Sequence, residues 1–175
     1  MVRRLVIVAS TGTSRILGFP NPVNEKAART VAAGVVVLTI AILVTQQWWL
    51  LVVLTYGFVA RVATGPTLSP LGQLATRVVA PRLGAPKHVP GPPKRFAQAV
   101  GAAFTLTASL LHFAFGLDTV ALALVAVIAV FATLESVFAF CMGCTAFGWL
   151  MRGGIIPERV CVECADLSSR LAARA

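Results

Sequence analysis

The distribution of charged residues is the feature of this sequence that most limits its fold. Residues 30–60 contain no Asp, Glu, Lys or Arg, and residues 96–134 contain only Asp118. The chain is 58% hydrophobic and 12% charged, with a mean hydropathy of +0.86. Uncharged apolar stretches of this length are typical of segments that cross a lipid bilayer. The sequence therefore predicts an all-α, polytopic integral membrane protein.

Four apolar runs predict four transmembrane helices, arranged as two helical hairpins with very short loops. The runs lie at residues 27–45, 48–63, 96–115 and 119–141 or beyond. Asn24 is the expected N-cap of the first helix. If the last run continued unbroken over residues 119–151, it would be about 50 Å long, whereas a hydrocarbon core is about 30 Å thick. We expect this run either to protrude from the bilayer or to break near Gly143.

A long connection, residues 64–95, separates the two hairpins. Ser69 and Pro70 are typical of a helix start, and three apolar residues follow at helical spacing, namely Leu71, Leu74 and Val78. This pattern predicts a short interfacial helix that lies on the membrane surface. Four prolines within residues 85–95 then predict an extended linker.

The basic residues predict the orientation of the chain. All 15 Lys and Arg residues lie in the N-terminal segment, the central connection, the C-terminal tail or the helix turns that border them. By the positive-inside rule, both termini and the connection are cytoplasmic. The expected domains are a cytoplasmic segment (1–26), a four-helix membrane domain (27–151) and a cytoplasmic tail (152–175). The net charge of +9 is assigned to topology and anionic lipid, not to nucleic acid, since the chain has no nucleic-acid-binding motif.

Four cysteines form two C-x-x-C pairs at the predicted cytoplasmic end of the fourth helix. The first pair is Cys141 and Cys144, and the second pair is Cys161 and Cys164. A reducing compartment argues against structural disulfides between them. Their spacing falls in the range of four-cysteine zinc sites, so zinc bound by all four is one interpretation. A redox or sulfur relay in which all four are catalytic is another, and inert packing is a third.

The two pairs differ in their expected helix environment. The first pair is expected at the C-terminal end of the fourth helix, where the helix dipole disfavours a thiolate. The second pair follows Pro157 and Glu158, the expected first turn of a tail helix. In the relay hypothesis the second pair exchanges with a soluble partner and passes electrons or sulfane sulfur to the first. A break at Gly143 would bring the two pairs close together.

Three further side chains have expected roles within the membrane domain. Glu135 lies inside the fourth run, and a carboxylate at that depth is usually paired or functional. Its predicted structural partner is Arg61, and a proton-relay role for Glu135 is the open alternative. His112, near the outer end of the third run, is expected to pack or to cap the loop with Asp118 rather than to bind a metal.

Three motifs resemble those of a known family: "NPVNEKAAR" before the first run, "GPPKRFAQAVG" leading into the third, and "FAFCMGC" closing the fourth. Over residues 19–166 the chain resembles a bacterial, mainly actinobacterial, family known as domain of unknown function 4395. The resemblance implies a multi-pass protein of the bacterial cytoplasmic membrane. Because some relatives are linked to thioredoxin-like or rhodanese-like proteins, the resemblance also implies a cytoplasmic partner of that kind. Among the four cysteines, the shared motifs contain Cys141 and Cys144.

The sequence thus favours thiol redox or sulfur-transfer chemistry at the inner membrane face, and it leaves open whether the protein is an enzyme. The alternative is a non-catalytic membrane scaffold or small transport module whose four cysteines bind structural zinc. The chain contains no nucleotide-binding loop and no catalytic triad motif. Four spans are few for a transporter, so transport would need a homo-oligomer, which stays open.

Overall fold

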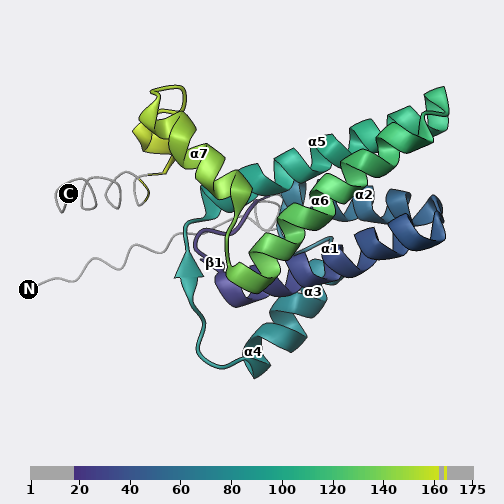
Figure 1. The fold of residues 1–175 in the computed structure, drawn as a ribbon. Coiled ribbons are helices and arrows are strands. Elements are labelled where there is room, and N and C mark those ends of the chain that lie inside the picture. Colours follow the sequence, from purple (N-terminus) through teal and green to yellow (C-terminus); the bar gives the residue numbers. More distant parts are fainter. Residues whose placement is uncertain (1–17, 162–163, 165–175) are drawn as a thin grey trace, which may run out of the picture.

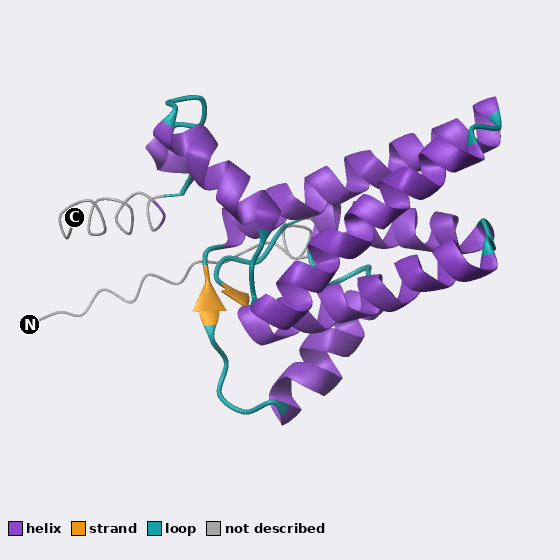
Figure 2. Ribbon diagram, viewed as in Figure 1, coloured by secondary structure: helices purple, strands orange, loops and turns teal. Residues whose placement is uncertain are grey.

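The computed structural model describes residues 18–161 and residue 164, and these residues are almost entirely helical (Figure 2). The α-helices are α1 (Glu25–Thr45), α2 (Trp49–Thr64), α3 (Pro70–Leu74), α4 (Ala80–Arg82), α5 (Gly91–Phe115), α6 (Asp118–Phe138) and α7 (Met142–Arg152). A π-helical turn, Ala75–Val79, joins α3 to α4, and a 3₁₀ turn covers Glu158–Val160. Two short strands, β1 (Val23–Asn24) and β2 (His88–Val89), pair in antiparallel fashion. The predicted all-α class is confirmed.

The two helical hairpins, α1–α2 and α5–α6, pack side by side as a bundle (Figure 1). Helix α1 lies along α6, and α2 lies along α5. Large apolar side chains fill the centre, among them Ile42, Leu51, Leu54 and Val125. The buried hydroxyls of Thr39 and Thr105 donate to carbonyls of their own helices, so they leave no unpaired donor in the core.

The surface of the bundle is suited to lipid. Helices α1, α5 and α6 are each long and apolar enough to cross a membrane. Helix α2 has 16 residues, or about 24 Å at about 1.5 Å per residue, and is a shorter apolar helix. Many large apolar side chains point outward, including Val37, Val44, Leu110, Phe113 and Val130. An apolar surface of this extent indicates a membrane protein.

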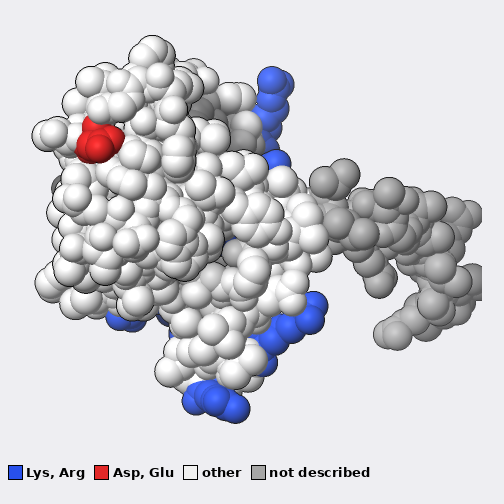
Figure 3. Space-filling model, turned by 90° about the vertical axis from the view of Figure 1, so that its right-hand side faces the viewer, with Lys and Arg blue, Asp and Glu red and all other residues white. Residues whose placement is uncertain are grey.

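The two hairpin turns lie at one end of the bundle, and α4, β1 and α7 lie at the other (Figure 1). Figure 3 looks onto the hairpin end, where a broad uncharged surface carries one acidic patch and basic side chains project only from its edge. At this end His112 Nδ1 lies 2.7 Å from Asp118 Oδ1, and the imidazole stacks on Trp48. The expected pairing of His112 with Asp118 is confirmed.

The connection between the hairpins packs closely against α1. A Cβ added to Gly34 would lie 2.5 Å from Leu71 Cδ1, so Gly34 gives α3 the room to approach. Ala75 and Ala80 are buried against the first turns of α1, whereas Leu74 and Val78 remain exposed. The predicted helix after Ser69 therefore forms, with part of its apolar face covered and part left free.

The proline-rich linker is shorter than the sequence suggested. Within it, His88 and Val89 pair with β1, and α5 begins at Gly91, five residues before the predicted start at residue 96. Pro92 and Pro93 occupy the first turn of α5, where a missing backbone N–H removes no helical hydrogen bond. Because α5 begins at Gly91, Lys94 lies in the first turns of a bundle helix and not in the linker.

The fourth apolar run forms two helices instead of one. Helix α6 ends at Phe138, Ala139 adopts a left-handed conformation with φ 57°, and α7 begins at Met142. The predicted break is present, but Gly143 is not its hinge. A Cβ on Gly143 would lie 2.5 Å from Ala97 Cβ, so this glycine is where α7 packs directly against α5.

Candidate functional site: a dithiol at the start of α7

The first cysteine pair occupies the N-terminus of α7. Cys141 is the N-cap residue in an extended conformation, and its Sγ accepts a hydrogen bond from the Cys144 backbone N–H at 3.4 Å. The prediction that this pair sits at a helix C-terminus is wrong, because the left-handed residue Ala139 ends α6 and the chain turns before Cys141. At a helix N-terminus the dipole and the unpaired N–H groups favour a thiolate.

The pKa values of the two thiols of the first pair are shifted in opposite directions. Both cysteines are free, with Cys141 buried and Cys144 partly exposed. The hydrogen bond from the Cys144 thiol lowers the pKa of Cys141, and the nearby Lys94 ammonium acts in the same direction against burial and Glu135. The same hydrogen bond, together with burial, raises the pKa of Cys144. Of the two thiols, Cys141 is the one whose surroundings favour the thiolate.

A buried ion pair borders the thiols. Lys94 Nζ, in the first turn of α5, donates to Glu135 Oε1, near the end of α6, at 2.6 Å. The predicted Glu135–Arg61 bond is wrong. Arg61 Nε donates to Gln98 Oε1 at 2.7 Å, and Arg61 Nη1 donates to the Ser69 hydroxyl at 3.2 Å. The early start of α5 explains the difference, because it brings Lys94 beside the carboxylate.

Cys141 lies between two cavities. An outer cleft of about 380 Å³ is bordered by both cysteines of the first pair, by Lys94 and by the β2–α5 corner. An inner, mostly apolar cavity of about 260 Å³ runs between α1, α5, α6 and α7 and is bordered by Cys141 and Glu135. The outer cleft therefore borders both thiols, while the inner cavity surrounds the side of Cys141 that faces the bundle with mostly apolar residues.

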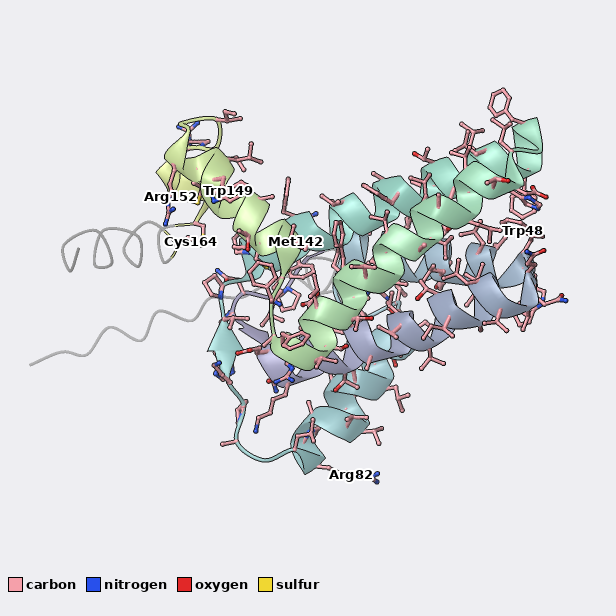
Figure 4. All side chains as sticks on the ribbon, in the orientation of Figure 1. Trp48, Arg82, Met142, Trp149, Arg152 and Cys164 are labelled. Atoms are coloured by element: carbon pink, nitrogen blue, oxygen red, sulfur yellow. A yellow bond between two sulfur atoms is a disulfide. The ribbon has the colours of Figure 1, made fainter. Side chains whose placement is uncertain are left out.

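The second pair forms a disulfide in the segment that follows α7. Cys161 and Cys164 are bonded, with their Cα atoms 5.3 Å apart. Figure 4 labels Cys164 and, on α7, Met142 and Arg152. Val160, which precedes Cys161, borders a cavity together with Phe147 and Phe96, so the chain turns back toward the bundle after α7. The expectation that the second pair stays reduced is wrong, and the described residues do not gather the four cysteines at one site. The predicted tail helix falls mostly outside the described residues.

No metal centre is assembled in the described part of the chain. Among residues 18–161 and residue 164, no three His, Cys, Asp or Glu side chains gather closely enough to hold a metal ion. A zinc ion bound by all four cysteines would need α7 or the tail to be rearranged.

Lys94 is a side chain of the candidate site that the sequence did not predict. The signal was present in "GPPKR", because two prolines followed by basic residues can open a helix as well as extend a linker. Four prolines within eleven residues favoured the linker, and Lys94 was therefore counted as part of a solvated basic stretch.

Comparison with known proteins places the chain in a family. The model of the family described as "domain of unknown function (DUF4395)" matches residues 23–152, which include the four bundle helices, the first cysteine pair and α7. The chain belongs to this family. Neither the curated proteins nor the solved structures contain a match.

Proposed function

We propose that this DUF4395 protein is a membrane thiol–disulfide exchange protein whose working pair is Cys141 and Cys144. The observation that carries the proposal is the position of Cys141. Cys141 is the N-cap residue of α7, and its sulfur accepts hydrogen bonds from Cys144 and lies close to the Lys94 ammonium. A thiolate in such a setting is stabilised, and the thiolate is the form that attacks disulfides.

The same proposal places the working pair at the cytoplasmic face of a four-span protein. Helices α1, α5 and α6 would cross the bilayer fully, and α2 would cross with them because its hairpin partner α1 does. The basic residues favour a cytoplasmic location for the end of the bundle that carries α7. The exposed Leu74 and Val78 would then rest on the inner membrane surface as part of an interfacial helix.

The chemistry is a two-step exchange. The Cys141 thiolate attacks one sulfur of a partner's disulfide, forms a mixed disulfide and releases the partner's other sulfur as a thiolate. The Cys144 thiol then loses its proton and attacks the Cys141 sulfur, so that an intramolecular disulfide forms and the partner leaves as a dithiol. The pair loses two electrons and the partner gains them. The Lys94 ammonium stabilises negative charge on sulfur in both steps.

Sulfur transfer would use the same nucleophile. The Cys141 thiolate would take the terminal sulfur of a persulfide, becoming a persulfide itself and releasing the donor as a thiolate. A thioredoxin-like or rhodanese-like cytoplasmic protein is the kind of partner that fits either reaction.

Trapping of the mixed disulfide tests the proposal. Both variants carry serine at Cys161 and Cys164, and each also carries one serine in the first pair. Cys144→Ser keeps a hydroxyl that can donate to Cys141 but removes the attacking thiol of the second step. We expect this variant to accumulate a mixed disulfide with oxidised thioredoxin or glutathione. Cys141→Ser is the matched control and should accumulate far less, since it leaves only Cys144, which is not the N-cap of α7 and whose pKa burial still raises. Equal trapping by the two variants would contradict the assignment of the nucleophile.

A further inference from the structure

A buried arginine at the same end of the bundle has an unused hydrogen-bond donor. Arg61 is 5% exposed, and its Nη2 has no hydrogen-bond partner among the described residues. The other guanidinium nitrogens bind the neutral side chains of Gln98 and Ser69, and the group stacks over the Phe58 ring with Cζ 4.7 Å from its centroid. A buried donor without a partner is costly, and a buried charge without a counterion is more so.

The carboxylates of this region are already bound to lysines. Glu135 accepts from Lys94 Nζ at 2.6 Å, and Glu25 accepts from Lys87 Nζ at 2.7 Å. Since Lys94 is itself buried, two buried cations share one largely buried carboxylate. With Cys141 as a neutral thiol, the region therefore carries an excess of one positive charge within the protein, and an anion would balance it.

Both cations border one cavity. A space of about 210 Å³ is lined by Arg61, Lys94 and Gln98 and by Asn24, Ala27 and Ala28 at the start of α1. Helix α1 is 21 residues long, and its N-terminus adds a positive dipole end, while the N–H groups of Glu25 and Lys26 already donate to Lys87 O and Asn24 Oδ1. Most of the remaining lining is apolar, so charge interactions in this space are screened less than in bulk water.

We propose that this cavity binds a tetrahedral oxyanion of the phosphate or sulfate type, held between Arg61 and Lys94. Arg61 and Lys94, which both line this space, are the charged donors for the anion, and charge-assisted hydrogen bonds of this kind are the strong ones. Two sources would supply the group: a free oxyanion from the cytoplasm, or the phosphate of an anionic lipid at the membrane surface. The site is separate from the thiol chemistry, although Lys94 borders both.

Binding to the full chain in a neutral detergent tests the proposal. Potassium phosphate, sulfate and thiosulfate are titrated separately, with potassium chloride at equal ionic strength as the reference, while affinity and melting temperature are recorded. Nanodiscs with and without phosphatidylglycerol form the lipid arm. We expect one anion per chain to bind saturably and to raise the melting temperature. Alternatively, the anionic lipid alone should give the same stabilisation. A response to the soluble salts identifies a free oxyanion, and a response to the lipid only identifies a headgroup.

Three variants make the test specific. Arg61→Gln should weaken binding about tenfold or more, because it removes a charged donor. Ala28→Leu fills the cavity without altering any charge and should also abolish the anion response. Arg95→Gln removes a charge from the exposed side of the same turn of α5 and should leave the response unchanged. Absence of any response in the parent protein, or a response in Arg61→Gln and Ala28→Leu as large as that of the parent, would overturn the proposal.

Discussion

Two glycines of α7 should respond in opposite ways to the same substitution. Gly143 packs against α5, and an added Cβ would lie 2.5 Å from Ala97 Cβ and 2.6 Å from Ala97 Cα. Gly148 lies on the same helix, and an added Cβ there would meet no atom within 4 Å. Alanine is a better helix former than glycine by about 0.5–1 kcal/mol. The two sites therefore differ only in packing, and each is the control for the other.

The expected free-energy changes follow from these distances. An ordinary contact begins near 3.4 Å, so in Gly143→Ala helix α7 must move from α5 by about 1 Å. Overpacking of this kind costs about 1–3 kcal/mol, from which the helix-propensity gain is subtracted. We expect a net loss of about 1–2 kcal/mol for Gly143→Ala and a gain of about 0.5–1 kcal/mol for Gly148→Ala.

Thermal unfolding in detergent measures both changes, at about 2–4 °C per kcal/mol for a chain of this size. In addition, Gly143→Ala moves Cys141 relative to Lys94, so it should slow alkylation of Cys141 at neutral pH, whereas Gly148→Ala should not. If Gly143→Ala proved as stable and as reactive as Gly148→Ala, the close packing of α7 on α5 would be refuted.

The remaining predictions concern the charges around the thiols and the direction of the chain. Because the pKa of Cys141 is lowered and that of Cys144 is raised, the pH profile of iodoacetamide labelling should show Cys141 reacting at lower pH than an ordinary thiol and Cys144 only at higher pH. Peptide mass spectrometry would separate the two sites, and a single shared profile would argue against the hydrogen bond. Lys94→Met should destabilise the protein by about 3–5 kcal/mol, since it leaves the Glu135 carboxylate buried and unpaired. The double variant with Glu135→Gln should recover part of that loss, and simple additivity in the unfolding measurements would contradict the pairing. A topology reporter inserted at Gly116 should report the outside and one fused to the C-terminus the cytoplasm, while the reverse pattern would move the cysteines to the oxidising side.

The bundle could be predicted because its causes are local. Apolar runs of membrane length, the Asn24 cap and two hairpin loops of a few residues determine which helices are neighbours. The pairing of His112 with Asp118 follows from the same short α5–α6 turn.

The site was harder to predict because it depends on where two helices start. The run from residue 119 to 151 carries no charge apart from Glu135. The left-handed residue that ends α6 is Ala139, and alanine is not a residue type that favours this conformation. A shift from one long helix to two moves Cys141 from a helix C-terminus to a helix N-terminus and reverses the effect of the dipole. Likewise, the early start of α5 supplies Lys94, which changes the partner of Glu135.

A redox titration of the first pair tests the central claim most directly. The protein with serine at Cys161 and Cys164 is equilibrated in glutathione buffers of graded potential, its thiols are counted by mass-tagged alkylation, and zinc is measured in the same sample. We predict that the thiols of Cys141 and Cys144 disappear together in a single two-electron transition, in zinc-free protein. Two thiols that stay reduced at every potential, or that are protected by stoichiometric zinc, would contradict the account.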